Sequence, residues 1–198
     1  MMKSFTHSPL PKTSICNWLW VTIFIFLLSS NATAQTFIHP GGLHTLADLD
    51  RMKAKVAAGE HPWIDDWNKL ITDGQAQNTY KAGAQANMGN SRQRADADAH
   101  AAYLNAIRWY ISGDTSYAAC ARKNLNAWAY AVNQVPSGTD ISGLGGIPVF
   151  DFALAGEVLR IYPNWSSTDF AQFKSMMTTY LLALFLALKS MMVTCPLL

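Results

Sequence analysis

Cysteine is scarce in this sequence, and the cysteines present do not form a known metal or redox pattern. There are three, Cys16, Cys120 and Cys195, and no two of them are spaced as C-x-x-C. Such pairs are typical of zinc sites and of thioredoxin-like redox motifs. His39 and His44 flank a Pro-Gly-Gly turn, but a metal there would need further ligands that the sequence does not offer. We therefore expect no metal site and no disulfide framework.

Strand signals are also missing, because alternation with β-branched residues is absent almost throughout. Apolar residues recur instead at helical spacing, which predicts a mostly α-helical chain built from consecutive antiparallel hairpins. The Gly- and Ser-rich stretch 136–146 is expected to be a connection. The expected helices start at or near Thr45, Pro62, Ala95, Asp114 or Thr115, Pro148, and Ser166 or Ser167.

The first 34 residues have the pattern of a secretory signal. Lys3 and Lys12 precede a nearly unbroken apolar run over 15–28, and Ala32-Thr33-Ala34 is a small-residue cleavage site. A transmembrane anchor is the alternative, although the run is short for a span of about 20 residues. We expect the mature chain to start near residue 35, to be periplasmic or secreted, and to have no stable membrane insertion after signal removal.

Excess charge of either sign is missing too. The whole chain has 15 Lys and Arg against 13 Asp and Glu. Removing 1–34 takes away two lysines and no acid, so 13 basic and 13 acidic residues remain and the formal net charge is zero. A nucleic-acid-binding domain needs a basic surface. The balance therefore argues against nucleic acid as a partner.

Acidic residues are absent between Asp73 and Asp96, whereas this interval contains Lys81, Arg92 and Arg94. Residues 74–91 are dominated by Gly, Gln, Asn and Ala, which predicts a long mobile loop. Loops longer than about 12–15 residues in a compact domain are usually functional or disordered. An otherwise neutral protein therefore has one local basic segment.

Four stretches of the sequence resemble the alginate lyase family of polysaccharide lyases. The resemblance extends over about 37–180, and its motifs belong to the helical scaffold. The four stretches are HPGGLHTLADLDRMKAKVAAGEHPW at 39–63, DADAHAAYLNAIRWYISGDTSYA at 96–118, LNAWAYAV at 125–132 and FDFALAGEVLRIYPNW at 150–165.

The resemblance implies an all-α fold, here an incomplete (α/α) toroid built from antiparallel helical hairpins with a groove for a uronic-acid polymer. It implies cleavage of alginate or a similar polyuronate by β-elimination, without a redox cofactor. In such a reaction, neutralising the C6 carboxylate acidifies the C5 proton, a base removes that proton, and an acid protonates the departing C4 oxygen. The expected partner is an acidic polysaccharide.

The basic segment contains the residues that we expect to bind this substrate: Tyr80, Lys81, Asn87, Asn90, Arg92 and Arg94. The cations would meet uronate carboxylates, the tyrosine would stack on a sugar, and the asparagines would bond hydroxyls. An ordinary solvated loop is the alternative, since asparagine is also common in turns. The catalytic residues are unknown, because we interpret His100 as structural or exposed, and Asp96 and Asp98 as acids at a helix start.

The end of the sequence departs from the family pattern. Residues 181–198 form an apolar tail without His or Asn, where the family would show an Asn- and His-containing motif. We interpret 35–180 as a partial family domain and the tail as truncation or a frameshift, which predicts weak or no activity for this chain alone. A genuine terminal helix is the alternative, and a catalytically inactive exported module that binds acidic polysaccharide is the alternative function.

Overall fold

The computed structural model describes residues 37–194 except residue 139. The expected signal peptide, 1–34, and the last four residues lie outside the described part. From Ile38 onward the described residues form one compact unit.

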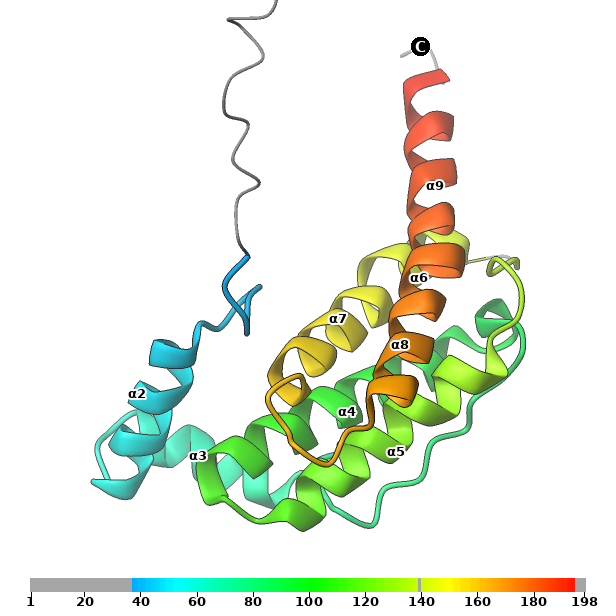
Figure 1. Ribbon diagram of the computed structural model, residues 1–198. Helices are drawn as coiled ribbons and strands as arrows, with labels where there is room; N and C mark the ends of the chain where they lie inside the picture. Colours follow the sequence, from blue (N-terminus) through cyan, green and yellow to red (C-terminus); the bar gives the residue numbers. More distant parts are fainter. Residues whose placement is uncertain (1–36, 139, 195–198) are drawn as a thin grey trace, which may run out of the picture. The chain divides into compact units, whose positions relative to one another are not determined.

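The described chain consists of helices and connections, with no strand in residues 37–138 and 140–194 (Figure 1). This confirms the all-α prediction. The helices are α2 (Leu46–Ala57), α3 (Trp63–Thr72), the short 3-10 turn η1 (Met88–Asn90), α4 (Arg92–Ser112), α5 (Thr115–Ala131), α6 (Ile141–Gly146), α7 (Pro148–Leu159), α8 (Ser167–Met176), the π turn η2 (Met177–Leu181) and α9 (Leu182–Thr194).

Side-chain caps start several of these helices where local sequence predicts them. The Thr45 hydroxyl accepts from the Asp48 amide and the Asp48 carboxylate accepts from the Thr45 amide, which forms a capping box at α2. Asp114 caps α5 by accepting from the Ser116 amide, and Ser166 caps α8 by accepting from the Asp169 amide. Between α4 and α5, Gly113 adopts φ +77°, a left-handed conformation that glycine reaches without strain.

Two helix boundaries differ from the sequence prediction. Ser91 caps α4, so this helix begins at Arg92, three residues before the first alanine of the apolar pattern. The stretch 136–146 also contains a helix, α6, which buries Leu144 despite its three glycines. Tertiary burial of one leucine here outweighs the low helix propensity of glycine.

The central helix is α4, which packs against both α5 and α7 (Figure 1). It presents small side chains to its neighbours, and small side chains let helix backbones approach closely. The buried alanines of α4 are Ala95, Ala99, Ala101, Ala102 and Ala106. Across the core, the Trp128 and Phe152 rings lie 5.8 Å apart, joining α5 to α7.

The tryptophans divide into buried and half-buried groups. Trp165 is buried, and its indole donates to the Asn126 side chain at 2.9 Å. Trp128 is fully buried, as core packing predicts. Trp63 and Trp67 are only half buried and line an apolar hollow of about 200 Å³ with residues of α2 and α4.

Helical backbone continues without interruption from Ser167 to Thr194, through η2. Leu181 and Leu184 are buried within it, whereas Phe185 is exposed. By length and composition alone, two helical stretches within the described residues are apolar enough to cross a membrane, Ile141–Leu159 and Ser167–Lys189. The first supplies Phe152 and other residues of the core, so its hydropathy has a structural explanation.

The connection between α3 and α4, residues 73–91, is called the strap here. Its composition predicts a mobile loop, but a buried carboxylate on α4 holds it. Asp98 is fully buried, and it accepts hydrogen bonds from the Tyr80 hydroxyl at 2.8 Å, the Gly83 amide at 2.8 Å and the Trp128 indole at 2.9 Å. Because α4 starts at Arg92, Asp98 lies within the helix and is not the helix-start acid expected from sequence.

Two further polar residues of α4 hold the first part of the strap. Asn105 donates to the Gln75 carbonyl at 2.9 Å, and Arg108 donates to the Ala76 carbonyl at 2.8 Å. The Arg108 guanidinium also lies 3.9 Å from the ring centre of Tyr117 on α5. Under the strap, the buried Cys120 thiol donates to the carbonyl oxygen of Tyr80 at 3.5 Å.

We expect Asp98→Asn to lower the free energy of unfolding by about 2–4 kcal/mol, because charge-assisted hydrogen bonds are lost and buried donors are left unmatched. Chemical denaturation followed by circular dichroism would measure this change. The matched control is Asp66→Asn on the exposed face of α3, expected to change stability by less than about 0.5 kcal/mol. Equal effects of the two substitutions would contradict the role assigned to Asp98.

The hydrogen bond from the Tyr80 hydroxyl to Asp98 predicts a loss of stability at high pH. Burial and the adjacent Asp98 carboxylate raise the pKa of Tyr80 from 10.0 to about 12. A raised tyrosine pKa stabilises the fold fully below pH 10, and this contribution disappears as the pH rises towards 12. Denaturation at pH 9 and pH 11 should therefore show a smaller loss in Tyr80→Phe than in the parent protein. An identical loss in both would exclude this contribution.

Candidate functional site

The strap and the beginning of α4 contain all six residues that the sequence analysis expects to bind substrate. Tyr80 is half buried, with its hydroxyl bonded to Asp98. Lys81 is exposed, and no hydrogen bond or ion pair involves its ammonium group within the described residues. The Asp98 contacts on either side, at Tyr80 and Gly83, therefore fix the backbone that presents the Lys81 ammonium to solvent.

The two asparagines have different environments. Asn87 caps η1 through its side-chain oxygen, and its amide nitrogen donates to the Ser137 carbonyl at 3.0 Å. Through these contacts, Asn87 joins the strap to the connection before α6. Gly89 lies at the same junction, where an added Cβ would be 2.0 Å from the Ser137 oxygen, so only glycine fits. Asn90 is exposed at the end of η1.

The two arginines also differ. Arg92 donates to Asp140 at 2.7 Å and lies 3.2 Å from Asp96, so two carboxylates already balance its charge. Arg94 is 48% exposed and lies 3.9 Å from Asp98, a longer ion pair. Its side chain passes directly over Gly83. Lys81 and Arg94 are thus the accessible cations of this segment, and both lie near the Tyr80–Gly83 stretch of the strap.

A polar cleft opens beside this segment, between the start of α4 and the start of α7. We name it the α4–α7 cleft. Its volume is about 350 Å³, and it is lined by Gln75, Gln93, Asp96, Ala97, His100, Ile147 and Asp151. In the cleft His100 and Asp151 face each other, with 3.4 Å between the imidazole Nδ1 and the carboxylate oxygen.

Asp96 has an unusual environment for a carboxylate. One of its oxygens lies 3.2 Å from Arg92, and the other is buried without a hydrogen-bond partner among the described residues. Burial raises the pKa of Asp96, as do the neighbouring carboxylates of Asp140 and Asp151, while Arg92 opposes the shift. The Asp96 carboxylate is therefore only partly matched by donors of the described residues.

A second pair of titratable groups lies close to the cleft. The His44 imidazole and the Tyr103 hydroxyl are 2.5 Å apart, joining the start of α2 to α4. Burial lowers the pKa of His44, although Asp48 partly offsets this. Burial, with a smaller effect of Asp151, raises the pKa of Tyr103 to about 12. Both groups are therefore neutral at pH 7, and the pair forms a neutral hydrogen bond.

The other two histidines in the described part of the chain, His39 and His61, take part in local or docking contacts. His39 lies 2.7 Å from Glu157 on α7, and the same carboxylate accepts from the Gly41 amide. His61 pairs with Asp65 at 2.8 Å on the exposed face of α3. In the described part of the chain, no three His, Cys, Asp or Glu side chains are grouped so that they could hold a metal ion.

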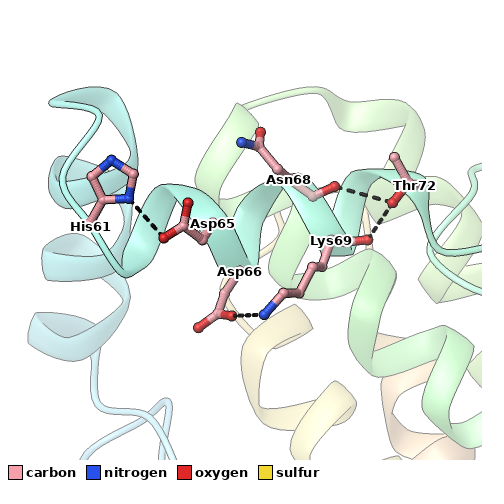
Figure 2. Close-up of polar contacts among 6 residues, drawn as sticks. All are labelled: His61, Asp65, Asp66, Asn68, Lys69 and Thr72. Carbon is pink, nitrogen blue, oxygen red and sulfur yellow. Dashed lines mark hydrogen bonds and ion pairs between the residues drawn. The ribbon is translucent and has the colours of Figure 1, made fainter.

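The exposed face of α3 contains polar pairs that resemble those of the site but lie outside the α4–α7 cleft. Figure 2 shows the His61–Asp65 pair and the Lys69–Asp66 pair, the latter 3.1 Å apart. All four residues belong to or directly precede one helix and lie three or four positions apart, as helix-stabilising pairs do. They provide matched controls for the α4–α7 cleft and for the basic segment.

Sequence reasoning did not identify the cleft, although one signal was present. Asp96 and His100 are four residues apart, so they share a helix face and both reach the cleft. The third partner, Asp151, is too distant in sequence to be paired with them from spacing alone. His100 was interpreted as structural or exposed, and it is exposed, but at the rim of a cavity.

Comparison with known families identifies one matching family model. The alginate lyase family matches residues 42–185, a range that extends from the turn before α2 into α9 and contains both the strap and the α4–α7 cleft. No curated protein and no solved structure matches the chain. The family match covers well over half of the sequence, and the chain therefore belongs to the alginate lyase family.

Proposed function

We propose that this protein is a polysaccharide lyase acting on a uronic-acid polymer such as alginate by β-elimination. The family match over residues 42–185 is the observation that carries this proposal. The reaction removes a proton from C5 and expels the oxygen at C4, leaving a double bond between these carbons. Because no electrons pass to an external acceptor, the reaction needs no redox cofactor.

The strap and the beginning of α4 support a role in binding the polymer. An anionic chain has one carboxylate per sugar, and exposed cations would neutralise these charges. Lys81 and Arg94 are the accessible cations at this position, whereas Arg92 is balanced by Asp96 and Asp140. The proposed carboxylate-binding residues are therefore Lys81 and Arg94, and no catalytic base or acid is assigned to a described residue.

The helical arrangement is compatible with the toroid that the resemblance implies. Asp98 of α4 contacts Trp128 of α5, and Arg108 contacts Tyr117, so residue numbers rise on α4 as they fall on α5. The two helices therefore run antiparallel. We propose that this pair and its neighbours are hairpins of an (α/α) ring whose groove passes the strap.

The proposal includes export. A polyuronate is too large to cross a membrane unaided, so its lyase would act in the periplasm or outside the cell, in agreement with the pattern of residues 1–34. The proposed partner is the acidic polysaccharide, with no nucleic acid and no stable membrane insertion of the mature chain.

The reaction is tested by incubating the purified protein with polymannuronate, polyguluronate and polyglucuronate in turn. We expect unsaturated uronate ends to form slowly at most, since the sequence predicts weak or no activity for this chain alone; ultraviolet absorbance detects them, and mass spectrometry of shortened products confirms them. Hydrolysis would add water and leave no double bond, so saturated products would contradict β-elimination. If none of the three polymers yielded unsaturated ends, the lyase proposal would be wrong for this chain.

The two accessible cations allow a separate test of substrate binding. We expect Lys81→Ala and Arg94→Ala each to weaken polyuronate binding about two- to fivefold, since exposed charge pairs contribute up to about 1 kcal/mol. Both effects should decrease at high salt because exposed charges are screened. The control is Lys69→Ala on α3, which removes the same charge elsewhere. Equal effects of Lys69→Ala and Lys81→Ala would indicate nonspecific attraction only.

The same observation favours a second candidate function, an exported module that binds acidic polysaccharide without cleaving it. Exposed cations at Lys81 and Arg94 would bind a polyanion whether or not elimination follows. Affinity that depends on these two residues, without any unsaturated product, would favour the binding module over the lyase.

A further inference from the structure

The α4–α7 cleft has the size and the lining of a site for a small polar ligand. Ligand pockets are typically about 300–1,000 Å³, so the cleft, at about 350 Å³, would hold one small unit. Five of its seven lining residues have hydrogen-bonding side chains: Gln75, Gln93, Asp96, His100 and Asp151. The cleft is therefore more polar than a gap left by imperfect packing of apolar helices.

Its two carboxylates come from opposite walls, Asp96 from α4 and Asp151 from α7. Their side chains are only 27% and 17% exposed, respectively. The buried oxygen of Asp96 has no hydrogen-bond partner in the described part of the chain, and leaving a buried acceptor unpaired is costly. Because that oxygen is inaccessible, a ligand in the cleft can reach Asp96 only at its other oxygen, beside Arg92.

The charges that line the cleft determine which ligand groups it can bind. Asp96 is partly balanced by Arg92, whereas among the described residues the ion-pair partner of Asp151 is His100, which is cationic only when protonated. A ligand carboxylate in the cleft would be repelled by the two acidic side chains. Hydroxyl groups, by contrast, can donate to carboxylates, and the Gln75 and Gln93 amides can both donate and accept.

We propose that the α4–α7 cleft is a sugar-binding subsite that recognises the hydroxyl groups of one sugar unit rather than its carboxylate. This inference rests on the proposed function in one respect, that the sugar belongs to the polyuronate. Asp96 and Asp151 accept from the hydroxyls, while Lys81 and Arg94 bind carboxylates of neighbouring units on the strap side of α4.

The hydroxyl-binding and carboxylate-binding residues can act separately because they lie on different faces of α4. Gln93, Asp96 and His100 share one face of the helix and line the cleft. Arg94 and Asp98 are four residues apart on another face, towards the strap. Adjacent residues at the start of one helix thus contact the two kinds of group that a uronate polymer presents.

The test measures binding of two tetrasaccharides, mannuronate tetrasaccharide and its neutral counterpart mannotetraose, to the full-length protein by isothermal titration calorimetry. Because a charge-assisted hydrogen bond is lost, we expect Asp151→Ala to weaken binding of both about tenfold. Removing a negative charge would by itself strengthen binding of the anionic oligosaccharide. Tighter or unchanged binding of mannuronate tetrasaccharide by Asp151→Ala would therefore overturn the proposal.

A second variant tests the cleft at a residue whose substitution should not destabilise the fold. Gln93 is exposed on the first turn of α4, so Gln93→Ala should fold normally and still weaken both oligosaccharides, by about threefold. The matched control is Asp65→Ala, which removes a carboxylate from the exposed His61–Asp65 pair on α3 and should change neither affinity (Figure 2).

The two proposals fail in different ways. Lys81→Ala should weaken mannuronate tetrasaccharide but not mannotetraose, since the neutral sugar has no carboxylate. If the polymer is cleaved or bound and the Asp151→Ala and Gln93→Ala variants match the parent for both oligosaccharides, the cleft inference is wrong and the proposed function stands. If mannotetraose binding depends on Asp151 while no polyuronate is bound or cleaved, the cleft inference stands and the proposed function is wrong.

Discussion

The arrangement of this region depends on one buried negative charge. Removing a carboxylate from water is unfavourable unless it is hydrogen-bonded and its charge is compensated. Asp98 meets this requirement with donors from the strap, at Tyr80 and Gly83, and from α5, at Trp128. The positions of strap, α4 and α5 are therefore mutually dependent. The position of Lys81 follows from this contact, because Lys81 lies between the two strap donors.

The central helix α4 has three distinct functions in the described structure. Its alanines allow close packing against neighbouring helices, and its buried polar residues Asp98, Asn105 and Arg108 hold the strap. Its first turns line the α4–α7 cleft. These functions require different residue types on different faces, which explains why a long buried helix lacks a simple apolar stripe. The proposed substrate contacts are consequently supported by a rigid element.

Local signals made the helices predictable from sequence, whereas the contacts that build the site are not local. Thr45 with Asp48, and Gly113 with Asp114, specify helix ends within a few residues of themselves, and the structure has these ends. Asp98, by contrast, reaches Trp128, thirty positions away. Nothing in the sequence near Asp98 distinguishes it from an ordinary helix-start acid. The cleft needs Asp151 from yet another helix, so composition and spacing could identify the basic segment but not the cavity beside it.

The position of Cys120 has a consequence for the chemistry of its thiol. The sulfur is buried beneath the strap and donates to the backbone carbonyl of Tyr80, and burial raises the thiol pKa. A protonated, covered sulfur reacts slowly with oxidants and alkylating reagents, because the thiolate is the reactive form. Exposure of this sulfur requires displacement of the strap that covers it. The rate at which a thiol reagent labels Cys120 therefore measures how often the strap, which presents Lys81 to solvent, opens.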